Sequence, residues 1–196
     1  MKLVVDCRWV TGDADDHLSL MSLGLIRALA ERRRFVMLVG PKTRLALLPD
    51  LPWELFPHPL SPREFLTGRR LNSIDADVLF SPAPTWGGWG RRYGLAIAGG
   101  VPQAAPDAPL SERLRLLSWR FPLTRGVMTR RADVIVGVSR AQQRSLITGS
   151  APGQPVVTLH ATDTGSDDVS AWRASAEQLE QVLIELDNSR RSARAK

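Results

Sequence analysis

The 196-residue chain is poor in cysteine, and its single thiol, Cys7, allows no intrachain disulfide. A chain without disulfides is typical of a reducing compartment, so we expect a cytoplasmic protein. It also lacks any run approaching ~18 uninterrupted apolar residues, which excludes a predicted transmembrane helix. The opening MKLVVDCRWV contains Asp6 and Arg8 within its short apolar run. This pattern does not match a signal peptide.

Motifs for common chemistries are absent as well. Ser139 follows a predicted strand, but no Gly-x-Ser-x-Gly elbow surrounds it. The acidic residues Asp13, Asp15 and Asp16, with His17, do not have the spacing of a calcium or zinc loop and are better explained by helix capping. We therefore expect no catalytic residue, no metal and no cofactor.

Lysine is scarce, whereas arginine is abundant, and the net charge is +6. A basic chain suits nucleic acid, an anionic lipid or a phosphorylated ligand, and the alternative is a compositional bias with no partner. Nucleic acid is disfavoured, because the chain has no recognisable binding motif and its aromatic residues do not alternate with the basic stretches.

Short apolar runs alternate with segments of helical period. The runs that predict strands are 2–6, 35–39, 53–56, 77–80, 93–98, 134–138 and 155–159, and the predicted helices are 17–33, 43–48, 62–71, 111–132, 140–147 and 169–186. Such repeated units predict an α/β fold with a doubly wound, mostly parallel, Rossmann-like sheet. We expect one domain over residues 1–160, a linker over 161–168, an amphipathic terminal helix over 169–188 packed on that domain, and a basic disordered tail over 189–196.

Ligands of such folds bind beyond the carboxyl ends of the strands, where several loops are rich in glycine. A glycine between the first strand and helix suits either a phosphate at the helix terminus or an ordinary turn. In the loop 82–92, tryptophan can stack on a sugar or base and arginine can pair with a phosphate, or the tryptophans can pack inward. The candidate ligand-binding residues are Thr11, Gly12, Trp86, Gly87, Gly88, Trp89, Arg91, Gly99 and Gly100.

The predicted helix 111–132, with Pro122 as its expected break, is amphipathic and basic. The residues Leu110, Leu114, Leu117 and Phe121 share one stripe. That stripe either lies on an anionic bilayer or packs on the sheet, and we expect the sheet, because helices of doubly wound folds usually bury their apolar face there. The candidate residues for a membrane or partner surface are Arg113, Arg115, Trp119 and Arg120.

Three stretches carry a family resemblance when taken in order. They are VVDCRWVTGDADDHLSLMSLGLIRALAER (4–32), DVLFSPAPTWGGWGRRYGLAIA (77–98) and RADVIVGVSRAQQRSLI (131–147). Together they resemble the N-terminal, acceptor-binding domain of family-4-like glycosyltransferases with the GT-B fold, over roughly residues 1–160. In that family a second domain binds the nucleotide sugar.

Two departures from the family bear on activity. The segment DDVSAWRASAEQLEQVLIEL resembles the family's last helix, which implies that the donor-binding domain between it and residue 160 is missing; alternatively, it is an unrelated amphipathic helix. Where many relatives have a His-Asp pair, this chain has Gly100 and Val101. The resemblance thus implies a truncated, glycosyltransferase-like pseudoenzyme that is inactive alone.

The resemblance also implies partners. They are a sugar or lipid-linked acceptor and, if the enzyme is split, a separate chain carrying the donor domain. Two alternatives stay open: a non-catalytic interaction module whose basic surface meets a protein or the inner face of a membrane, and a small enzyme that uses the cleft loops unaided.

Overall fold

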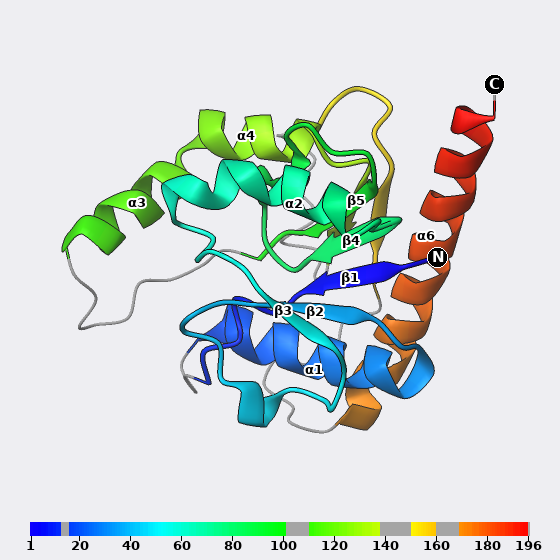
Figure 1. The fold of residues 1–196 in the computed structure, drawn as a ribbon, viewed down its shortest axis with the longest axis horizontal. Coiled ribbons are helices and arrows are strands. Elements are labelled where there is room, and N and C mark those ends of the chain that lie inside the picture. The colour runs from blue at the N-terminus through cyan, green and yellow to red at the C-terminus, as the bar shows by residue number, and fades with distance from the viewer. Residues whose placement is uncertain (13–15, 101–109, 138–149, 160–168, 196) are drawn as a thin grey trace.

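A seven-stranded parallel sheet organises the chain (Figure 1). The computed structural model describes residues 1–12, 16–100, 110–137, 150–159 and 169–195. All strand pairs of the sheet are parallel. The strands are β1 (Leu3–Asp6), β2 (Val36–Val39), β3 (Trp53–Leu55), β4 (Val78–Ser81), β5 (Gly94–Ala98), β6 (Val134–Gly137) and β7 (Val156–Thr158). The predicted α/β, Rossmann-like fold is confirmed.

The strand order is β3-β2-β1-β4-β5-β6-β7, so the winding direction reverses between β1 and β4. That reversal is the topological switch point, where doubly wound folds open a crevice at the carboxyl ends of the strands. Helix α1 (His17–Arg32) lies on one face of the sheet (Figure 1). Helices α2 (Thr67–Ser73) and α4 (Pro122–Arg130) lie on the opposite face (Figure 1). Three short 3-10 helices, η1 (Leu45–Leu47), η2 (Pro62–Leu66) and η3 (Trp86–Gly88), complete the connections.

Local sequence signals explain where these elements begin. The Asp16 carboxylate accepts a hydrogen bond from the Leu18 amide at 3.0 Å and caps α1, as expected. Ser61 caps η2 in the same way, with Pro62 at its first position. Both caps satisfy amides that a helix terminus leaves without an intrahelical partner.

The terminal helix α6 (Val169–Arg194) packs against α1 on the main domain, which confirms the expected packing. Trp172 is only 1% exposed and lies against Gly24. The helix continues to Arg194, so residues 189–194 are helical where we expected a disordered tail. The last turns are held because Arg190 donates to the Tyr93 carbonyl and Arg191 pairs with Asp187. The expected linker 161–168 lies outside the described residues.

The basic amphipathic segment forms two helices, α3 (Leu110–Arg120) and α4, with the break at Pro122. The expectation that its apolar stripe packs on the sheet is wrong, because Leu110, Leu114, Leu117 and Phe121 are all exposed. Figure 1 shows the reason: α3 extends beyond the sheet at one end of the molecule, where no sheet surface lies under it. No helix among the described residues is long and apolar enough to cross a membrane.

Candidate functional site

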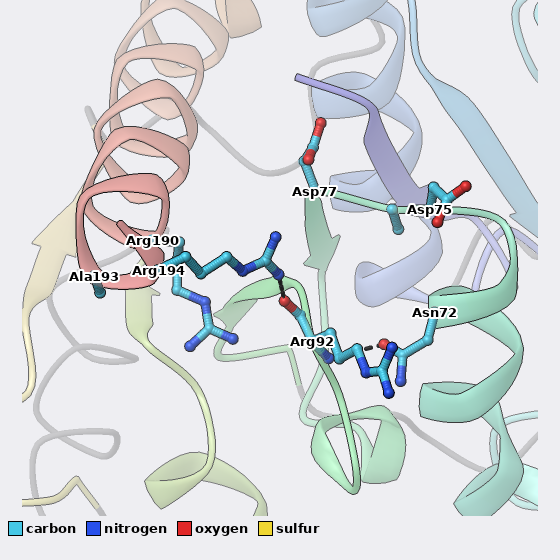
Figure 2. A pocket seen from close by; sticks show the side chains of 8 residues that line it. Asn72, Asp75, Asp77, Arg92, Arg190, Ala193 and Arg194 are labelled. Atoms are coloured by element: carbon cyan, nitrogen blue, oxygen red, sulfur yellow. Dashed lines mark hydrogen bonds between the residues drawn. The ribbon is translucent and has the colours of Figure 1, made fainter. Parts of the chain in front are cut away.

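A cavity of about 520 Å³ opens at the amino edge of the sheet, between the end of α2, the start of β4 and the last turns of α6 (Figure 2). It is lined by Asn72, Asp75, Ala76, Asp77, Arg92, Arg190, Ala193 and Arg194. None of the predicted ligand-binding residues lines this cavity.

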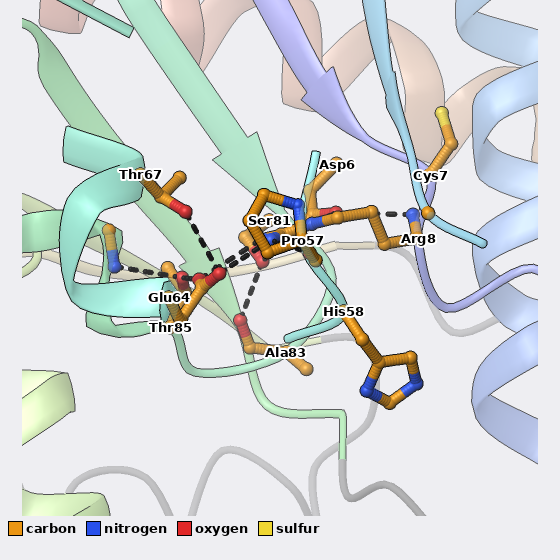
Figure 3. A network of polar contacts seen from close by, with 12 residues as sticks. Asp6, Cys7, Arg8, Pro57, His58, Glu64, Thr67, Ser81, Ala83 and Thr85 are labelled. Atoms are coloured by element: carbon orange, nitrogen blue, oxygen red, sulfur yellow. Dashed lines mark hydrogen bonds and ion pairs between the residues drawn. The ribbon is translucent and has the colours of Figure 1, made fainter. Parts of the chain in front are cut away.

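The carboxyl edge, where the fold places ligands, holds a buried arginine (Figure 3). Arg8 follows β1 at the switch point, and its guanidinium is fully buried between two carboxylates. Its Nε and Nη2 donate to the two oxygens of Asp6, each at 2.8 Å. Its Nη1 and Nη2 donate to Glu64 at 2.5 and 3.1 Å, and Nη1 also donates to the Pro57 carbonyl at 3.0 Å. All five N–H donors of the guanidinium therefore have acceptors.

The carboxylates of Asp6 and Glu64 also have hydroxyl groups as hydrogen-bond donors. The single proton of the Ser81 hydroxyl is within hydrogen-bond reach of the Ala83 carbonyl at 2.8 Å and of Asp6 at 3.2 Å. Thr67 and Thr85 donate to Glu64 at 2.9 and 2.6 Å. We name these six residues the Arg8 network: Asp6, Arg8, Glu64, Thr67, Ser81 and Thr85. The charged groups of this network already have hydrogen-bond partners within it, so they are not left to bind a ligand or to transfer a proton. The network therefore holds the surrounding loops in place.

Burial and charge act in opposite directions on this network. Desolvation alone would lower the pKa of Arg8, but the carboxylates of Asp6 and Glu64 outweigh it and raise that pKa. The neighbouring Cys7 thiol is buried, and its pKa is raised, first by desolvation and then by Asp6. A buried thiol with a raised pKa is a poor nucleophile, so Cys7 is part of the core rather than a reactive group.

Thr11 and Gly12 form the turn between β1 and α1. Their amides donate to the Ser19 hydroxyl at 3.1 and 3.2 Å. Gly12 has φ +77°, and a Cβ on it would lie 2.6 Å from the Arg44 Cδ. The two amides thus already have a partner on α1, and phosphate binding there stays a prediction.

Gly99 and Gly100 are buried at the carboxyl end of β5. The Gly100 amide donates to the Pro82 carbonyl at 3.0 Å, and a Cβ on Gly100 would lie 2.4 Å from both that oxygen and the Leu18 Cδ1. The position where the resemblance implies a histidine therefore has no room for a side chain. Val101 lies outside the described residues.

The loop 82–92 crosses from the carboxyl end of β4 to the amino end of β5. Trp86 packs on Phe65 with ring centroids 4.9 Å apart, and the half-exposed Trp89 ring lies 3.8 Å from the Arg131 guanidinium. The carbonyl of Gly87 accepts a hydrogen bond from the Tyr93 hydroxyl. These contacts fit a structured loop.

The neighbouring positions of that loop are also engaged. Gly88 is buried against Arg131 and Leu95. Arg91 pairs with Asp133 at 2.7 Å, at the amino ends of β5 and β6. The predicted ligand-binding residues therefore do not form one site, because Arg91 lies at the amino edge of the sheet and Gly12 and Gly100 lie at the carboxyl edge.

The Arg8 network is what sequence reasoning missed. The visible signal is an Asp-x-Arg pair directly after a buried strand, which is an unusual place for two charges. Its partner Glu64 is 56 positions away, inside a short 3-10 helix, and nothing local to Glu64 marks it as buried.

Helices α3 and α4, with Phe121 between them, carry six of the thirteen large hydrophobic residues that are exposed in the described part of the chain. Of the surface candidates, Arg113 is exposed, whereas the side chains of Arg115, Trp119 and Arg120 lie outside the described residues. We name as the apolar–basic face the exposed apolar residues of α3, of α4 and of the position between them: Leu110, Leu114, Leu117, Phe121, Leu123 and Val127. Residues 110–131 contain six arginines and one glutamate, a net charge of +5 against +6 for the whole chain.

Neither a protein-family model nor a curated protein matches this chain. Among the residues that the structure describes, no group of three or more His, Cys, Asp or Glu side chains could hold a metal ion.

Proposed function

We propose that this chain is a glycosyltransferase-like acceptor domain that does not transfer sugar by itself. The observation that supports it concerns two described parts of the carboxyl edge: the groups of the Arg8 network are paired with one another, and Gly100 leaves no room for a side chain. Glycosyl transfer requires a positioned nucleophile and groups that stabilise the departing diphosphate. The six residues of the Arg8 network and Gly100 offer neither. The acceptor class, a sugar or a lipid-linked sugar, follows from the resemblance, as does a separate donor-domain chain.

Calorimetric titration with UDP- and GDP-glucose tests the inactive state. We expect no binding and no hydrolysis with the purified chain, since the groups at the carboxyl edge are already paired. A complete two-domain glycosyltransferase serves as the positive control. Micromolar binding of either nucleotide sugar to this chain would contradict the proposal.

A second function, peripheral contact with an anionic membrane, is favoured by the apolar–basic face. Its leucines are far from buried: Leu110 is 72% and Leu123 is 75% exposed. Large apolar side chains left exposed along one helical segment indicate an interaction site, and a basic helix that exposes its apolar side can lie in the headgroup region of an anionic bilayer. The exposed Arg113 and Arg130 would each contribute about 1 kcal/mol near such a surface.

Liposome flotation tests the membrane proposal. The wild-type chain should float with phosphatidylglycerol vesicles at low salt, should not float with phosphatidylcholine vesicles, and should lose binding as salt screens the charges. The double variant Leu114→Glu/Leu117→Glu should not float. The matched control Leu45→Glu changes an exposed leucine of η1, outside this face, and should float like the wild type. Absence of flotation with anionic vesicles at low salt would remove the membrane role and leave a protein partner for this face.

A further inference from the structure

Three arginines line the cavity at the amino edge of the sheet (Figure 2). Arg92 lies in the loop before β5, while Arg190 and Arg194 come from successive turns of α6. The Arg194 guanidinium donates to the Arg92 carbonyl, and Arg190 donates to the Tyr93 carbonyl at 2.8 Å. These bonds fix α6 against the loop and so fix the cavity wall.

The three guanidinium groups have little compensating charge. Among the described residues, neither Arg92 nor Arg194 forms an ion pair, and the ion pair of Arg190 with Asp133 is 3.7 Å long. The Nε of Arg190 is buried and has no hydrogen-bond partner in the described part of the chain. Burial lowers the pKa of Arg190, Asp133 opposes that change, and the positive charges of Arg91 and Arg194 add to it.

The acidic residues of the cavity do not neutralise this cluster. Asp77 accepts a hydrogen bond from the Lys2 amide at 2.6 Å and pairs with Arg191 at 3.6 Å. Asp75 lies at the turn after α2, and Figure 2 shows both carboxylates directed away from Arg92. The arginine wall is therefore positive and faces a space of about 520 Å³.

We propose that this cavity binds a phosphorylated small molecule, whose phosphoryl groups pair with the arginines of the cavity wall, Arg92, Arg190 and Arg194. The planar fork of an arginine matches two phosphate oxygens, and a multiply charged anion relieves the repulsion between Arg190 and Arg194. The volume is within the range of small-molecule sites, about 300–1,000 Å³. No aromatic side chain lines the cavity, so its recognition is of charge rather than of a base. The site is separate from the sugar-transfer and membrane proposals, because it lies at the other edge of the sheet from Arg8 and, in Figure 1, at the opposite end of the molecule from α3.

Inorganic pyrophosphate is the probe for this site, measured by calorimetry and by thermal melting. We expect binding that stabilises the fold, such that pyrophosphate at ten times its Kd lowers the unfolding equilibrium constant about elevenfold. Sodium chloride at the same ionic strength should not reproduce the effect. Equal effects of chloride and pyrophosphate would overturn the proposal.

Variants locate the site. Arg92→Gln/Arg194→Gln should weaken pyrophosphate binding about a hundredfold, at about tenfold for each charged hydrogen-bond donor removed. Ala193→Glu, which adds a negative charge to the same wall, should weaken it without removing an arginine. The matched control Arg34→Gln removes an exposed arginine elsewhere and should bind normally. Unchanged affinity in the double variant, with its circular dichroism also unchanged, would overturn the assignment.

A flotation experiment distinguishes two sources of the phosphoryl group, a soluble ligand and a lipid headgroup. If the ligand is soluble, Arg92→Gln/Arg194→Gln should float with phosphatidylglycerol vesicles as the wild type does. If the double variant instead loses flotation and pyrophosphate does not bind the wild type, the arginines serve a lipid headgroup and the soluble ligand is ruled out.

Discussion

Trp172→Ala is the substitution that most directly measures how firmly α6 closes the core. The indole is buried between α6 and α1, in the same cluster as Leu25 and Leu29. Truncation of a buried tryptophan removes its transfer free energy and leaves a cavity, at a cost of about 3–5 kcal/mol. The total stability of a domain is about 5–15 kcal/mol, so the variant should remain folded but be strongly weakened.

Urea unfolding followed by circular dichroism gives the magnitude. A loss of about 4 kcal/mol with a slope of about 2.5 kcal/mol/M corresponds to a midpoint shift of about 1.6 M. Trp53→Ala is the matched control, because Trp53 is 52% exposed on the edge strand β3 and should change stability by about 0.5 kcal/mol or less. A midpoint for Trp172→Ala within 0.3 M of the wild type, which is below about 1 kcal/mol at that slope, would refute the packing described for α6.

A second substitution tests the contact itself. A Cβ on Gly24 would lie 2.3 Å from the Trp172 Nε1, so Gly24→Ala should destabilise the wild type by about 1–3 kcal/mol. In the Trp172→Ala background the same change should cost little, because the space is free. Additive effects in the double-mutant cycle would show that the two residues do not touch.

Three further predictions concern buried groups. Tyr93 is the only tyrosine, and burial raises its pKa, so tyrosinate absorbance should appear only when the chain unfolds. Because the phenol of the unfolded chain ionises near pH ~10, the free energy of unfolding should hold below that pH and fall above it. A reversible titration of Tyr93 in the folded chain at pH ~10 would contradict this prediction. Gly100→Ala should lower the melting temperature, since its Cβ meets the Pro82 carbonyl at 2.4 Å; an unchanged melt would mean that the edge can open. Arg8→Met should cost about 3–5 kcal/mol by leaving Asp6 and Glu64 buried without a cation, and Arg8→Met/Glu64→Gln should recover part of it in urea unfolding.

The architecture could be predicted from sequence because each of its signals is local. Near-continuous apolar runs predict buried parallel strands, and Asp16 and Ser61 mark helix starts within two residues of the amides that they cap. The apolar stripe on α3 was also predicted from the sequence. A stripe indicates only that one face of a helix is apolar, and it does not indicate which part of the molecule covers that face.

The candidate site was harder to predict from the sequence, because its features depend on contacts that are not local. Whether Gly100 has room for a side chain depends on Pro82 and Leu18, which belong to other loops and helices. The Arg8 network needs Glu64, and the cavity needs α6 to return to β4 and β5. These are tertiary contacts between distant segments, which neither periodicity nor residue spacing encodes.

The contact between α1 and α6 also has a consequence for folding on the ribosome. Arg173 of α6 bonds to Glu31 of α1, 142 positions earlier in the chain. At a synthesis rate of about 5–20 residues per second, the apolar side of α1 leaves the exit tunnel on the order of 10 s before the helix that covers it. During that interval the side of α1 that Trp172 covers in the folded chain has no α6 to pack against.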